Sequence, residues 1–162
     1  GRIEWRCCGP AARVAVDLAG RRCEGLGYAE HLVMTLPAER MPLRELQWGR
    51  FIAAEANCVW IRWTGPIARS WGFYNGNTVA AEPGAGSGLR WPGHRLELAP
   101  GLTLRSGRVA DTVFNRAPML RRFFPSALGD LVETKWCSRG VLTDAQGRRH
   151  DGWAIHEVAA FP

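Results

Sequence analysis

Lysine is nearly absent from this chain. Twenty of its 21 basic residues are arginine, and Lys135 is the single lysine. Against 15 acidic residues, they give the 162-residue chain a formal net charge of +6. Arginine suits phosphate, so a nucleic-acid partner is one interpretation. The arginines are scattered, however, because the only adjacent pairs are Arg21-Arg22, Arg121-Arg122 and Arg148-Arg149. Since no basic stripe forms, we attribute them to codon preference and expect no nucleic-acid partner.

Long apolar runs and familiar catalytic signatures are missing too. No run approaches the roughly 18–20 apolar residues that span a bilayer, so we expect no stable membrane insertion. The opening residues hold no apolar signal-peptide core. The chain also lacks a phosphate-binding loop, a dinucleotide fingerprint, the Gly-x-Ser-x-Gly turn and the His-Glu-x-x-His motif. These absences argue against nucleotide hydrolysis, serine-hydrolase chemistry and zincin chemistry.

Cysteine spacing excludes the common zinc sites. The five cysteines are odd in number and no Cys-x-x-Cys occurs. Cys58 and Cys137 lie in strand-like apolar runs, which is typical of reduced cysteines that pack as small hydrophobes. We expect a reducing, cytoplasmic location, and neither a metal nor an organic cofactor.

Glycine and proline interrupt the chain every eight to twelve residues, the spacing of short antiparallel strands. One short helix is expected at 117–124, with Pro118 in its first turn and Pro125 ending it. Turns are expected at Asn75-Gly76-Asn77 and at 144–147, the second of them a hairpin turn before the final strand. Strands are predicted at 2–8, 12–18, 27–36, 45–52, 57–64, 68–74, 89–98, 101–108, 110–115, 130–138 and 152–160. Residues 1–162 therefore read as one all-β domain, an antiparallel barrel of roughly eight to ten strands.

The strand at 27–36 carries the main clue to function. Its alternation places Tyr28, Glu30, Leu32 and Met34 on one face and His31 on the other. The first face is the more apolar, so we expect it to be buried with Glu30 on it. A carboxyl group in apolar surroundings needs a partner, a proton or a catalytic role.

Motifs between Gly27 and Gly65 carry a family resemblance. They are Gly27-Tyr28-Ala29-Glu30-His31, then Pro42-Leu43, Trp48-Gly49-Arg50 and the strand 59–63. The chain thereby resembles the carotenoid 1,2-hydratase superfamily of lipocalin-like proteins, to which tocopherol cyclase is similar. The closing strand from Gly152 to Glu157 resembles a barrel strand of that family. The acid in that family is usually Asp, followed by His and Asn, whereas this chain has Glu30, His31 and Leu32. The family usually has two such domains in tandem, and this chain has the length of one. The resemblance therefore does not identify the substrate.

The resemblance implies a lipocalin-like, calycin-type barrel and a cofactor-free cyclase or hydratase. Its substrate would be an apolar unsaturated small molecule, isoprenoid or polyketide-like. Glu30, helped by Tyr28 and His31, would protonate a double bond or an epoxide, and tryptophan faces would stabilise the cation. The residues expected to line the substrate are Trp48, Trp60, Trp63, Trp71, Trp153, Glu157 and Met34.

Several alternatives stay open at this stage. Arg50 or Arg62 could pair with Glu30, which would lower the pKa of Glu30 and argue against its role as an acid. Glu157 could share a proton with Glu30, or it could be a surface residue if the face of Ala154 and His156 is the buried one. A barrel that only carries a hydrophobic ligand is the main functional alternative, and a basic module for an acidic partner is a weaker one. The sequence leaves the oligomeric state, including a homodimer, undecided.

Overall fold

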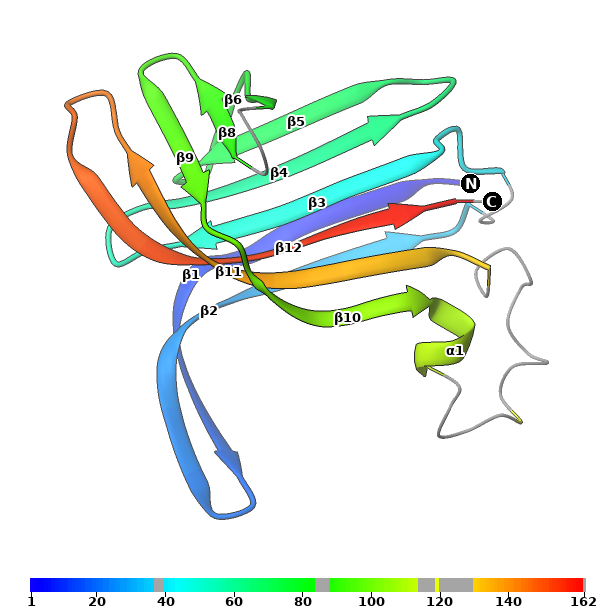
Figure 1. Ribbon diagram of the computed structural model, residues 1–162, viewed down its shortest axis with the longest axis horizontal. Helices are drawn as coiled ribbons and strands as arrows, with labels where there is room; N and C mark the ends of the chain where they lie inside the picture. Colours follow the sequence, from blue (N-terminus) through cyan, green and yellow to red (C-terminus); the bar gives the residue numbers. More distant parts are fainter. Residues whose placement is uncertain (37–39, 84–87, 114–118, 120–129, 162) are drawn as a thin grey trace.

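A computed structural model describes residues 1–36, 40–83, 88–113, 119 and 130–161. Two long strands, β1 (Ile3–Leu18) and β2 (Arg21–Met34), form a separate antiparallel hairpin. The other strands form one antiparallel sheet (Figure 1). They are β3 (Glu45–Ile52), β4 (Asn57–Thr64), β5 (Arg69–Tyr74), β6 (Asn77–Val79), β7 (Glu82–Pro83), β8 (Leu89–Trp91), β9 (His94–Leu98), β10 (Leu102–Arg108), β11 (Val132–Thr143) and β12 (Arg149–Ala160).

The large sheet curls into a nearly closed barrel, which confirms the all-β, antiparallel fold class. Its strand order is β6-β5-β4-β3-β12-β11-β9-β8-β7. β11 serves two partners on one edge, since residues 140–143 pair with β9 and residues 132–137 pair with β10. The barrel therefore has one end built with β8 and β9 and another built with β10.

Strand register defines the two faces of the sheet. Phe51 pairs with Cys58 and with Ala154, and all three are buried. We call their side of the sheet the inner face. Its packed end is formed by Phe51, Ala53, Ala56, Cys58, Trp60, Leu89, Trp91, Leu96, Leu142 and Ala154. The opposite side, which carries Trp48 and Arg50, is the outer face.

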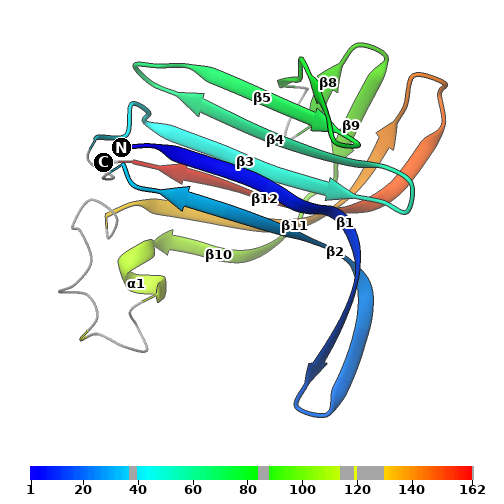
Figure 2. The ribbon, with the colours of Figure 1, turned by 180° about the vertical axis from the view of Figure 1, so that it is seen from behind.

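The hairpin of β1 and β2 lies across the outer face (Figure 2). The Trp5 ring contacts the Phe73 ring with centroids 5.3 Å apart, and Tyr28 contacts Trp48 at 6.1 Å. The hairpin therefore provides a second layer over β3 and β5. Its distal half extends beyond the sheet as a free arm, with Leu18 and Leu26 exposed.

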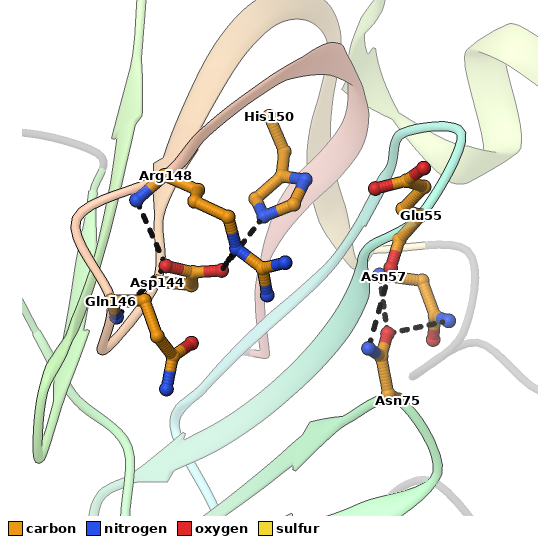
Figure 3. A network of polar contacts seen from close by, with 7 residues as sticks. All are labelled: Glu55, Asn57, Asn75, Asp144, Gln146, Arg148 and His150. Atoms are coloured by element: carbon orange, nitrogen blue, oxygen red, sulfur yellow. Dashed lines mark hydrogen bonds and ion pairs between the residues drawn. The ribbon is translucent and has the colours of Figure 1, made fainter.

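Both predicted turns are confirmed, and the first also joins two paired strands, β5 and β6. Tyr74 pairs with Asn77, and Asn75 and Gly76 between them have positive φ angles of 46° and 82°, which suits a two-residue turn. The Asn75 side chain accepts a hydrogen bond from the Asn57 backbone at 2.8 Å (Figure 3). In the second turn, Asp144 is buried and accepts from Arg148 and from the Gln146 amide.

Asp144→Asn is expected to lower the melting temperature at pH 7. Burial alone would raise the pKa of Asp144, but hydrogen bonds from His150, Arg148 and Gln146 outweigh it and hold that pKa well below its usual range. A depressed folded-state pKa gives stability that is present above about pH 4 and is lost as the pH falls. Thermal unfolding of both proteins between pH 7 and 2 should show the difference shrinking below about pH 4. A constant difference would contradict this assignment.

Several strand predictions differ from the structure, and one helix prediction is untested. The strand predicted at 89–98 is two strands, β8 and β9, in which Trp91 pairs with His94. The strand predicted at 110–115 is a helix as far as it is described, because Val109–Val113 forms α1, whose Ala110 is buried, and residues 114–115 lie outside the described residues. The helix predicted at 117–124 lies outside the described residues except for Met119. Within the described ranges, no helix is long and apolar enough to cross a membrane.

Candidate functional site

Glu30 lies between the hairpin and the outer face, where Arg50 binds it. Arg50 Nε donates to Glu30 Oε1 at 3.0 Å, and Arg50 Nη2 makes a second bond to the same oxygen. Trp5 Nε1 donates to Oε2 at 3.1 Å. The expected environment, an apolar cavity without a counter-charge, is therefore wrong. The structure instead has the ion pair with Arg50, which the sequence offers as an alternative, and the Glu30 carboxylate accepts three N–H bonds.

Arg50 is the centre of this contact because it is fully buried. Its side chain is 0% exposed, against 16% for Glu30. Nη1 donates to the Pro10 carbonyl at 3.0 Å, and the guanidinium lies 4.6 Å from the centroid of the Tyr28 ring. Arg50 thus fastens both strands of the hairpin to β3.

A second group of charges lies on the same outer face beside Tyr28. Lys135 Nζ is 2.6 Å from Glu157 Oε2 and 3.6 Å from Glu133 Oε1, and Arg105 also binds Glu133.

Burial raises the pKa of Glu157, and Lys135 only partly offsets this increase. Burial lowers the pKa of Lys135, but the bond to Glu157 outweighs it and the net shift is upward. Burial and Glu30 raise the pKa of Tyr28. The structure therefore brings together four of the predicted site residues beneath the hairpin. They are Tyr28, Glu30, Trp48 and Glu157.

The other predicted site residues are dispersed. His31 is exposed on the far side of β2. Met34 and Leu32 are 41% and 58% exposed, so the face expected to be apolar and buried is buried only around Tyr28 and Glu30. Trp63 and Trp71 contact each other edge to face on the outer side, with centroids 5.0 Å apart. The expectation that these tryptophans line the barrel interior is wrong, because strand alternation points them outward with Trp48 and Trp153.

Trp153 lies in an open groove on the outer face. The groove has a volume of about 550 Å³ and is lined by 97–99, 139–141 and 151–153. Trp153 is 52% exposed, and the Arg139 guanidinium lies 5.0 Å from its ring centroid.

The inner face carries a row of rings across four adjacent strands. Trp60 pairs with Gly49, Gly49 with His156, and His156 with Trp136. A Cβ at Gly49 would lie 2.0 Å from Cζ2 of Trp60, so glycine provides the space in which the indole lies. The His156 ring stacks on Trp136 with centroids 5.2 Å apart and a 23° angle, and Trp60 lies 6.4 Å from it. We call Trp60, His156 and Trp136 the ring row.

The ring row marks the boundary between the packed end of the inner face and a half-open end. Trp60 is 8% exposed and belongs to the core, whereas His156 and Trp136 are half-buried. Further along the same face, Gln47 and Arg62 are half-buried as well. Side chains of the described residues therefore leave this end of the inner face partly accessible.

His156 is fixed by a buried serine. Its Nε2 lies 2.9 Å from Ser138 Oγ, and Ser138 is 1% exposed. Burial lowers the pKa of His156, which favours the neutral imidazole. Sequence reasoning missed Trp136 and Ser138 and treated His156 only as a neighbour of Glu157. The available signal was the alternation of β12, which places Ala154 and His156 on one face, although the face of Glu157 and Ala159 is covered as well.

The described part of the chain holds no group of three or more His, Cys, Asp or Glu side chains arranged to bind a metal ion. Comparison of the chain with protein-family models, with curated proteins and with solved structures finds no match. The likeness to carotenoid 1,2-hydratases therefore remains a prediction from sequence motifs. Function has to be argued from the geometry of the barrel itself.

Proposed function

We propose that this protein binds an apolar, ring-containing small molecule at the half-open end of its inner face. The observation that carries the proposal is the ring row, in which two half-buried rings continue from a packed aromatic core. Ligand sites in small barrels combine aromatic walls with a few polar groups. The outer face is a weaker candidate, because its hairpin side is occupied by ion pairs.

The proposal predicts unequal effects of two tryptophan substitutions on binding of the probe 2-naphthol. Trp136→Leu should weaken binding by about tenfold, because it removes a stacking surface of the ring row. Trp63→Leu is the matched control, because Trp63 is also half-buried but lies on the outer face. Isothermal titration calorimetry of both variants measures the difference. Equal effects of the two substitutions, or no binding to the unaltered protein, would contradict the proposal.

The cofactor-free cyclase or hydratase is the second candidate. Its support is the approach of Tyr28, Glu30 and Glu157, together with the raised pKa of Glu157. Because Arg50 holds Glu30, Glu157 would be the proton donor in this version. Incubation with farnesol in heavy water tests it, since protonation of an alkene would leave deuterium in a hydrated or cyclised product. Loss of that product in Glu157→Gln, with the fold retained, would support the candidate, and unchanged farnesol would reject it.

A further inference from the structure

We propose that His156 Nδ1 binds a hydroxyl group of the ligand while the ligand ring packs beside Trp136. The inference rests on the proposed function and names the class of ligand: a planar, largely apolar ring system that carries a hydroxyl. Two observations carry it, the occupation of one imidazole nitrogen by a buried serine and the availability of the other.

The imidazole is held in one place and one orientation. Nε2 is engaged by Ser138 at 2.9 Å, and the ring lies on the Trp136 indole. Ser138 is itself enclosed, because a Cβ added at Gly101 would lie 2.2 Å from its Oγ. Ser138 is therefore a positioning residue, which fixes where the second nitrogen points.

Nδ1 of His156 is the group left for a ligand. Among the residues that the structure describes, no side chain or backbone group forms a hydrogen bond with Nδ1. Nδ1 is also absent from the fully buried polar atoms that lack a partner, so it is accessible from the solvent side. It lies in a half-buried ring between two indoles, where water is partly excluded and a hydrogen bond gains strength. A group on an apolar ligand would therefore find one directional polar contact in aromatic surroundings.

The chemistry of a neutral imidazole selects the hydroxyl. One nitrogen donates and the other accepts, and the Ser138 hydroxyl can take either role toward Nε2. Nδ1 is thus an acceptor in one tautomer and a donor in the other. A hydroxyl satisfies both tautomers, whereas a carboxylate fits only a donor and an ammonium fits only an acceptor. The hydroxyl is the simplest group that binds whichever tautomer is present.

The test compares 2-naphthol with naphthalene, which has the same ring system and no hydroxyl. The unaltered protein should prefer 2-naphthol by roughly 3- to 10-fold, the range expected for one net hydrogen bond. His156→Phe keeps a ring on Trp136 but removes Nδ1, so the two probes should bind equally. His94→Phe is the matched control, because His94 also stacks on a tryptophan, with Trp91 5.1 Å away, and should leave the preference intact.

A second measurement tests the same contact without the His156→Phe variant, in case that variant does not fold. In the unaltered protein, the ¹⁵N shift of His156 Nδ1 should move when 2-naphthol is added and not when naphthalene is added. Ser138→Ala should reduce the preference for 2-naphthol without abolishing naphthalene binding. Retention of the preference in His156→Phe, or an unmoved Nδ1 signal, would overturn this inference alone. If neither probe binds to the ring row, the proposed function fails with it.

Discussion

Glu30→Ala is expected to lower the free energy of unfolding by about 3–5 kcal/mol, because it leaves the fully buried Arg50 without its counter-charge. The loss should be concentrated at the hairpin, since Arg50 also binds the Pro10 carbonyl and contacts Tyr28. Urea unfolding measures the free energy. Faster proteolysis between residues 9 and 27 would locate the opening.

Glu24→Ala is the matched control on the same strand. Glu24 pairs with Arg22, but both side chains are more than 60% exposed, so its removal should cost less than about 1 kcal/mol. A double variant with Glu30→Ala and Arg50→Met should recover part of the loss, because it removes the unpaired charge as well. If Glu30→Ala costs no more than Glu24→Ala, the ion pair does not hold the hairpin in place.

Gly49→Val is expected to destabilise the barrel by about 3 kcal/mol and to disturb the ring row. The new Cβ would lie 2.0 Å from the indole of Trp60, which is buried, so β3 or the indole would have to shift within a packed core. Urea unfolding reports the stability. The ellipticity of the tryptophans in the near ultraviolet reports the rings.

Gly25→Val is the control, because Gly25 lies in β2 and a Cβ added there would have nothing within 4 Å. Valine suits an exposed strand, so this substitution should be neutral within about 0.5 kcal/mol or slightly stabilising. Similar losses in Gly49→Val and Gly25→Val would mean that the contact between Gly49 and Trp60 does not organise the inner face.

Much of the fold follows from local patterns in the sequence. The strand predictions at 45–52 and 57–64 coincide with β3 and β4, because alternation and turn residues both mark their limits. The prediction of separate strands at 2–8 and 12–18 missed one long strand, since β1 continues through irregular pairing between Cys7 and Ala12. The strand predicted at 110–115 is wrong over residues 110–113, because the chain turns there into the short helix α1 directly after β10.

The site was harder to predict, because alternation shows which residues share a face and not which face is inside. The expectation for Trp63 and Trp71 assigned them to the interior. Register across β3, β4 and β5 places them on the outer side. The environment of Glu30 depends on Arg50, 20 residues away, whose pairing was offered only as an alternative. The link between Ser138 and His156 needs the pairing of β11 with β12, which no single-strand pattern contains.

The indole N–H signals of the eight tryptophans test the central claim most directly. Two-dimensional NMR during titration with 2-naphthol observes both faces of the sheet in one experiment. The account predicts shifts at Trp60 and Trp136, with Trp63, Trp71 and Trp153 unmoved. Shifts at Trp153 or at the pair of Trp63 and Trp71, with Trp60 and Trp136 unmoved, would place the binding site on the outer face and contradict it.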